Sequence, residues 1–240
     1  MGTYASLVVT TMPKRHGVSA LWRAARAAAD IRDRDGVDHC RAVQGARFRA
    51  DVLPPFTPGR VGVMTWACSL ATLVACDRDL RSRLDAYARE TWQVLLEPVS
   101  VEGDWFGYVP EVTGAAPLRL AEPAVVLING VLRARHAIRF TRDNARVASQ
   151  LQDAPGYLGG LGISDTPMTT TSLSCCRTRR DSRAFAFGAG AHQHAYKIDL
   201  AQNRHSTTFF VRFRPLASSG SIDGRDPFAD INLGAAVPVE

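Results

Sequence analysis

The chain has 240 residues, of which 46% are hydrophobic and 22% charged, with a formal net charge of +6. These values are typical of a globular protein with one large or two small domains, and they exclude an intrinsically disordered chain. The arginines that carry the positive charge are scattered along the sequence and are not interleaved with aromatics, so we predict no nucleic-acid partner.

Cysteine usage and hydropathy indicate the compartment. The five cysteines form no CxxC pair and have no zinc-type spacing, which is typical of a reducing environment. The first residues, MGTYASLVV, lack the charged start and long apolar stretch of a signal peptide. The longest apolar run, Val61–Cys76, is shorter than the roughly 20 residues that a membrane helix needs. We therefore predict a cytoplasmic protein with no transmembrane segment.

Hydrophobic periodicity predicts the elements of the first half. In chain order these are a strand at Tyr4–Thr11, a helix at Val18–Ile31 capped by Ser19, a strand at His39–Val43, an irregular loop at Gln44–Arg60, a strand at Val61–Trp66, a short helix or turn at Ser69–Ala75, an amphipathic helix at Arg78–Glu90 and a strand at Trp92–Val99.

The second half gives a similar series. We expect a connecting strand within Pro123–Ala134, a first strand at Arg135–Phe140, a helix at Arg142–Gln152, strands at Gly156–Ile163 and Thr169–Cys176, one helix within Asp181–Ala201 and a last strand at Ser206–Pro215.

The repeated order β-α-β-β-α-β predicts an α+β fold of two ferredoxin-like halves that form a dimeric-type α/β barrel. The expected division is an N-terminal half at 1–108, a linker at 109–123 and a C-terminal half at 124–240. The four tryptophans Trp22, Trp66, Trp92 and Trp105 are expected in the core.

Two histidines, His192 and His194, lie in a predicted helix flanked by glycine and alanine. Small neighbours would let a flat ring approach the helix, and a histidine nitrogen can hold haem iron. Side chains two positions apart on a helix project about 200° apart, so only one of the pair can face such a ring. The residues alone do not decide which one.

The stretch from 185 to 228 joins this helix to the β-rich run STTFFVRF and to the turn GRDPF. In this order it resembles the C-terminal part of the spheroidene monooxygenase family. The similarity extends to earlier segments and is weakest over 1–60. Cys176 stands where the family has an aromatic residue, and Gln44–Pro58 fits loosely. The earlier matching segments are Met64–Trp66, Asp79–Trp92, Leu95–Ser100, Gly103–Gly107, Gly159–Pro167 and Ser172–Cys176.

The resemblance implies a haem-dependent monooxygenase of the carotenoid-tailoring type. It selects His192 as the iron ligand. The implied cofactor is haem b, held non-covalently because no CxxCH motif occurs. The implied partners are an apolar or small secondary-metabolite substrate, dioxygen and a ferredoxin-type electron donor, and a homodimer is left open.

Other residues are weaker candidates. Arg139, Arg212 and Arg214 are expected to pair with haem propionates, since arginine suits carboxylate recognition, although a solvated strand face explains them as well. Cys175 and Cys176 could instead offer a thiolate to iron. Two other functions stay open because a fold does not fix a function: a haem enzyme such as an aldoxime dehydratase, without external reductant, or a non-enzymatic hydrophobic-ligand-binding barrel.

Overall fold

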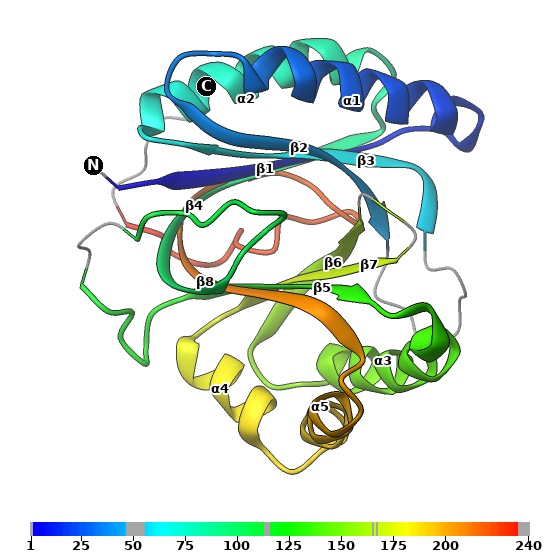
Figure 1. Ribbon diagram of the computed structural model, residues 1–240. Helices are drawn as coiled ribbons and strands as arrows, with labels where there is room; N and C mark the ends of the chain where they lie inside the picture. The colour runs from blue at the N-terminus through cyan, green and yellow to red at the C-terminus, as the bar shows by residue number, and fades with distance from the viewer. Residues whose placement is uncertain (1, 47–55, 113–115, 165, 167, 235–240) are drawn as a thin grey trace.

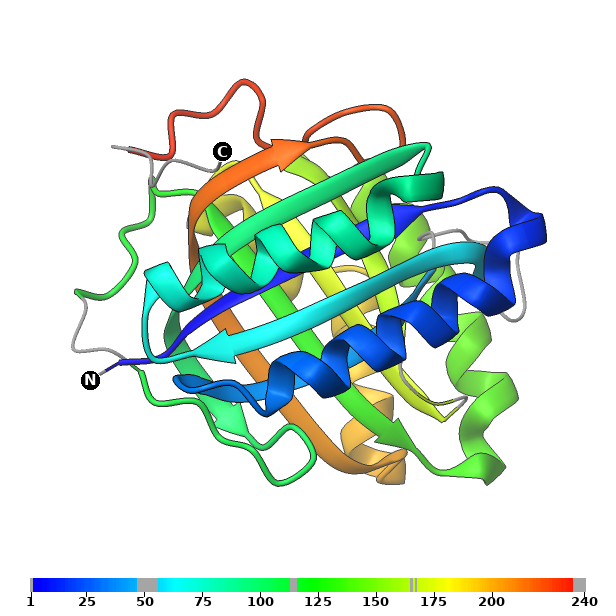
Figure 2. The ribbon, with the colours of Figure 1, turned by 90° about the horizontal axis from the view of Figure 1, so that it is seen from above.

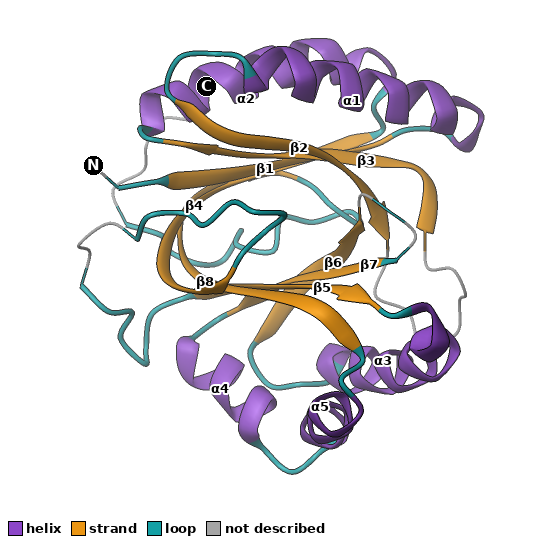
Figure 3. Ribbon diagram, viewed as in Figure 1, coloured by secondary structure: helices purple, strands orange, loops and turns teal. Residues whose placement is uncertain are grey.

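The computed structural model describes residues 2–46, 56–112, 116–164, 166 and 168–234. Within this part, eight antiparallel strands close into one barrel, and helices cover two opposite sides of it (Figures 1 and 3). The strands are β1 (Tyr4–Thr11), β2 (Val37–Ala46), β3 (Phe56–Ala67), β4 (Glu90–Gly103), β5 (Ala124–Leu132), β6 (Tyr157–Ser164), β7 (Thr169–Cys176) and β8 (His205–Gly220). The helices are α1 (Gly17–Arg32), α2 (Leu70–Leu84), α3 (Ala137–Gln152), α4 (Arg179–Phe187) and α5 (Ala191–Gln202), with short 3-10 turns η1 (Lys14–His16), η2 (Asp85–Tyr87) and η3 (Ala134–His136).

The barrel consists of two halves with the same strand order. Around the barrel the strands run β1-β3-β2-β6-β7-β5-β8-β4, so each half has its fourth strand beside its first. The halves meet along a long seam between β4 and β8 and a shorter one between β2 and β6, where Gln44–Ala46 of the described residues pair with the end of β6. The predicted fold class is confirmed. The division at 1–108, 109–123 and 124–240 stays a prediction, although the connection from β4 to β5 does span the linker residues.

Four predicted elements differ in the structure. Arg135–Phe140 is not a strand: it contains η3 and the first turn of α3, and β5 is the first strand of this half. The alternating pattern of RHAIRF is misleading because Ile138 is 67% exposed instead of buried against a sheet. The helix predicted within Asp181–Ala201 is two helices, α4 and α5.

The third difference is α2, which is continuous across the break predicted after Ala75. It continues because Asp77 is buried and accepts hydrogen bonds from Ser6 Oγ and Gln93 Nε2, both at 2.7 Å. The predicted loop Gln44–Arg60 is shorter than expected, since β2 runs to Ala46 and β3 begins at Phe56. Residues 47–55 of that loop lie outside the described residues.

Helix α1 turns Trp22 toward solvent instead of burying it against the sheet. Figure 2 shows α1 and α2 lying over the strands of the N-terminal half, roughly along their direction. Trp22 is 61% exposed, so its assignment to the core is wrong. Ser19 is not a cap either, because its hydroxyl donates to the carbonyl of His16 at 2.9 Å. The small side chains bring α1 close to β2 and β3, where a tryptophan would not fit. The buried face consists of Ala20, Ala24, Ala27, Ala28 and Ile31.

The interior of the barrel is filled by side chains. The other three tryptophans, Trp66, Trp92 and Trp105, are buried there as predicted, together with Phe209 and Phe213 of β8. The barrel interior is therefore packed core instead of an open channel. Among the described residues, no helix combines the length and apolar character needed to cross a membrane.

Candidate functional site

The two helical layers are packed to different degrees. In the N-terminal half, the outward side chains of the sheet are buried under α1 and α2: Val8, Val61 and Val63 are at most 1% exposed. They contact buried alanines and leucines of the two helices. This layer provides an internal reference, because the C-terminal half repeats the same topology.

The corresponding layer of the C-terminal half is incompletely filled. Ile128 lies in the middle of β5, between Ser172 of β7 and Phe210 of β8, yet it is 40% exposed. Neither α4 nor α5 contributes a buried residue, and α5 packs mainly on α3 and α4 instead of on the strands. The outer face of the sheet under these helices is apolar at its centre, at Ile128, and its side chains remain partly accessible to solvent. The other half-buried outward side chains of these strands include Val126, Ser174 and Arg212.

His192 lies at the junction of α4 and α5. It is the second residue of α5, and its half-buried ring packs against Phe185 of α4 with a centroid separation of 5.3 Å. Its Nδ1 donates a hydrogen bond to the carbonyl oxygen of Ala186 at 3.0 Å. Burial lowers the pKa of His192, opposed by this hydrogen bond, so the imidazole is neutral at pH 7. The tautomer with its proton on Nδ1 leaves the lone pair of Nε2 for a ligand or metal.

His194 has a different environment. It is exposed, and no side-chain contact is present for it among the described residues. The neighbouring junction is tied to α3, since the backbone N–H of Ala191 donates to Gln150 Oε1 at 2.7 Å. The structure therefore separates the two histidines as helix geometry requires, with His192 turned toward α4.

The three predicted arginines lie in separate environments. Arg139 is exposed on the first turn of α3. Arg214 pairs with Glu97, lies 3.6 Å from Glu122 and donates to the carbonyl of Ala116, so its charge is already compensated. The assignment of these two to a cofactor carboxylate stays a prediction.

Arg212 is different because it lacks a carboxylate partner among the described residues. Its Nη1 donates to Ser100 Oγ at 3.2 Å, and its buried Nε has no hydrogen-bond partner. Burial, and then the nearby charges of Arg179 and Arg183, lower its pKa. Sequence reasoning missed Arg179 and Arg183, although both lie in the basic segment RTRRDSR, residues 177–183, directly after β7. The three arginines form a cationic group that favours an anion at this edge of the layer.

The cysteine alternative is not supported by the surroundings of the two thiols. Cys175 points into the barrel core, and burial raises its pKa well above the ordinary range. Burial also raises the pKa of Cys176 to about 11, despite a hydrogen bond with Ser182. Both side chains are therefore protonated thiols near neutral pH, and only the thiolate is a good iron ligand.

The donor set fits a haem. The described residues contain no group of three or more histidine, cysteine or acidic side chains that could hold a metal ion. A single neutral histidine with a fixed Nδ1–H suits a metal whose other ligands come from a macrocycle. An apolar, incompletely filled layer and an arginine group without an ion pair among the described residues match the ring and the carboxylates of such a cofactor.

Comparison with known proteins gives a consistent result. No protein-family model matches the chain. The chain is 26% identical over 161 residues to spheroidene monooxygenase from Rhodobacter capsulatus, with 65% of this chain and 66% of that protein covered. It is 26% identical over 145 residues to spheroidene monooxygenase from Cereibacter sphaeroides, with 60% of this chain and 44% of that protein covered. The matches therefore span less than two thirds of the length of either relative.

Among solved structures, the fold is similar to that of an aldoxime dehydratase crystallised with butyraldoxime. The TM-score is 0.55 at 8% sequence identity, and the match covers 88% of this chain and 78% of the other. At this identity the likeness concerns the fold alone. The similarity to spheroidene monooxygenases that the sequence predicts is thus confirmed, on a barrel of two ferredoxin-like halves.

Proposed function

We propose that this chain is a haem-dependent monooxygenase that oxidises an apolar or small secondary-metabolite substrate with dioxygen and an external, ferredoxin-type electron donor. The observation that carries the proposal is His192: a neutral imidazole with its Nδ1–H held by Ala186 and its Nε2 available, beside a layer that its own side chains do not fill. The similarity to the two spheroidene monooxygenases supports the reaction class and an apolar substrate.

Different residues of the chain would hold the iron, bind the propionates and exclude water. His192 would hold the iron through Nε2, and the carbonyl of Ala186 would fix the ring orientation and strengthen the donor. Arg212, with Arg179 and Arg183, would pair with the propionates of haem b. Ile128 and the half-buried side chains beside it would form an apolar wall that excludes water. Bound haem would supply the activation of dioxygen.

The first experiment is spectroscopic. We expect the protein, expressed with added haem, to show a Soret band that shifts on reduction with dithionite and again with carbon monoxide. Colourless protein that does not bind added haemin would overturn the cofactor assignment and leave a hydrophobic-ligand-binding barrel.

The second experiment separates reaction classes. An oxygenase consumes dioxygen in a substrate-dependent way only when a reductant is supplied, whereas an aldoxime dehydratase converts its substrate without net consumption of either. We expect reductant-dependent oxygen uptake with a carotenoid substrate. Turnover of an aldoxime without net reductant consumption would replace the oxygenase proposal by the dehydratase.

A further inference from the structure

The positive charge of the chain is concentrated in one region. Residues 133–204 contain 11 of the 29 arginines and lysines but only 5 of the 23 acidic residues, a surplus of six that equals the net charge of the whole chain. This region contains α3, α4 and α5, which cover the C-terminal half of the barrel (Figure 1). The net positive charge, whose arginines are scattered in the sequence, therefore arises mainly from one helical layer and the turns beside it.

On α3 and the turn before it, the arginines follow a helical repeat. Arg135, Arg139, Arg142 and Arg146 are four, three and four positions apart, so they project within about 60° of one another. Arg139 and Arg142 are exposed and form no ion pair with the described residues, and Arg146 has only a loose contact of 3.7 Å with Asp143. This row is a continuous cationic stripe on the outer side of the helix.

Each of the three helices also exposes a large apolar side chain beside its basic residues. Ile138 of α3 is 67% exposed, Phe187 of α4 is 69% exposed and Leu200 of α5 is 64% exposed. Phe187 lies four positions after Arg183 and seven after Arg180, on one face of α4. Helices with basic side chains and projecting apolar ones are typical of proteins that bind at a bilayer surface.

We propose that this face, formed by α3, α4 and α5, binds the surface of a bilayer that contains anionic lipid. The arginine guanidinium groups would contact the lipid phosphates. The methylene chains of the arginines and the exposed apolar side chains would reach the boundary between the lipid headgroups and the acyl chains. Nucleic acid and an acidic protein also attract arginine, but neither explains exposed aliphatic side chains such as Ile138 and Leu200. The consequence for function rests on the proposed oxygenase: the face lies over the incompletely filled layer, so an apolar substrate in the bilayer would have a short path to it.

The test is binding to vesicles, which needs neither haem nor substrate and so stands apart from the oxygenase proposal. We expect the full chain to bind vesicles that contain about one-third phosphatidylglycerol and to dissociate from them at about 1 M salt. It should bind vesicles of phosphatidylcholine alone poorly. The triple variant R139E/R142E/R180E should lose binding at least about 100-fold, because each basic side chain near an anionic surface contributes roughly a fivefold factor.

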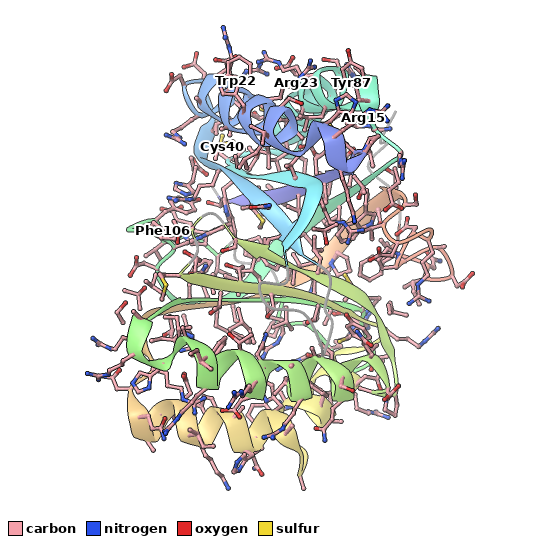
Figure 4. All side chains as sticks on the ribbon, turned by 90° about the vertical axis from the view of Figure 1, so that its right-hand side faces the viewer. Arg15, Trp22, Arg23, Cys40, Tyr87 and Phe106 are labelled. Atoms are coloured by element: carbon pink, nitrogen blue, oxygen red, sulfur yellow. The ribbon has the colours of Figure 1, made fainter. Side chains whose placement is uncertain are left out.

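A matched control changes the same net charge on the other helical layer. Arg26, Arg78 and Arg89 are exposed in the N-terminal half, where Figure 4 shows the exposed Trp22 and Tyr87. R26E/R78E/R89E should retain most of the binding. An equal loss in both triple variants would mean that net charge alone attracts the protein, and would overturn the assignment of a face.

A second pair of measurements examines the apolar contribution. F187S/L200S keeps the charge and should weaken vesicle binding. Brominated lipid should quench the tryptophan fluorescence of F187W more than that of the wild type. Unchanged binding in the serine variant would contradict insertion. The bilayer proposal would be overturned if the protein did not bind vesicles at low salt but bound duplex DNA or an acidic ferredoxin. Loss of that binding in R139E/R142E/R180E would identify the other molecule as the partner of this face.

Discussion

Asp77 gives the most quantitative prediction. It lies on the buried face of α2 and is 1% exposed, with its carboxylate oxygens accepting hydrogen bonds from Ser6 and Gln93, which are also buried. Burial raises its pKa from 3.8 to about 7, although the two hydrogen bonds oppose the rise. Replacing Asp77 by asparagine keeps the shape and removes the ionisation; the Gln93 amide then turns so that its oxygen accepts from the new Asn nitrogen.

The direction of the pH effect on stability follows from comparing the ionisation of Asp77 in the folded and unfolded states. Below about pH 4, Asp77 is protonated both folded and unfolded, so no cost arises. Between pH 4 and pH 7 only the unfolded state ionises, and above pH 7 the folded state must hold a buried charge. At 1.36 kcal/mol for each pKa unit, the shift to about 7 corresponds to about 4 kcal/mol at pH 8. The wild type should therefore lose stability from this group as the pH rises from 4 to 7.

We expect D77N to unfold at higher urea concentration than the wild type at pH 8, by up to about 4 kcal/mol, with the difference disappearing at pH 4. The buried tryptophans Trp66 and Trp92 report the transition by fluorescence. Asp79 is a control of opposite sign: burial raises its pKa, but hydrogen bonds and charges of Arg83 and Arg34 lower it on balance, so D79N should destabilise at pH 8. A D77N protein that is less stable than the wild type at pH 8 would refute the reasoning.

Three further predictions concern the candidate site. H192A should lose the Soret band, whereas H194A should keep it, and the reverse pattern would show that the wrong histidine is assigned. R212Q should weaken haem binding on the order of tenfold in a haemin titration, because a charged hydrogen bond to a carboxylate is lost; R214Q, whose arginine is paired with Glu97, should bind haem with nearly wild-type affinity. I128F should fill part of the open layer, raise the stability of the haem-free protein by about 1 kcal/mol in urea unfolding, and weaken haem binding; unchanged haem affinity would place the cofactor elsewhere.

The order of elements could be predicted because the strands are rich in β-branched residues and are separated by clear turn signals. Strands β1 and β7 match their predicted bounds, Tyr4–Thr11 and Thr169–Cys176, in the structure. The continuous helix α2 could not be predicted, because Cys76-Asp77-Arg78 reads as polar and only the buried partners of Asp77 allow the helix to continue. Hydrogen bonds between residues 71 positions apart leave no local signal.

One wrong assignment hid a surface feature. With Arg135–Phe140 interpreted as a strand, Arg135 and Arg139 have no regular relation to Arg142 and Arg146. Once this segment is placed in η3 and α3, the four arginines fall on one face. The signal was present in the sequence, but it depends on the correct helical period.

The candidate site was only partly accessible to sequence reasoning. The resemblance selects His192, and its surroundings are consistent with that choice, because it is the half-buried member of the pair. The group formed by Arg212, Arg179 and Arg183 joins β8 to the start of α4, so no sequence spacing connects Arg212 to the other two. The unfilled layer around Ile128 could not be predicted either, since an isoleucine in a central strand is expected to be buried.

The contrast between the two helical layers constrains the interpretation of that gap. Both halves have the same strand order, so a barrel of this topology can bury the outer face of its sheet completely, as the N-terminal half does with small alanines facing Val61 and Val63. An exposed isoleucine between packed strands forgoes part of the roughly 1.5–3 kcal/mol that full burial of such a side chain contributes. If the layer around Ile128 were only loosely packed, we would expect no particular arrangement of the polar groups around it. Here the same layer also holds a histidine with one ring nitrogen fixed by a backbone carbonyl and Arg212, which has no ion pair among the described residues, and this is why we propose a flat, anionic ligand for it.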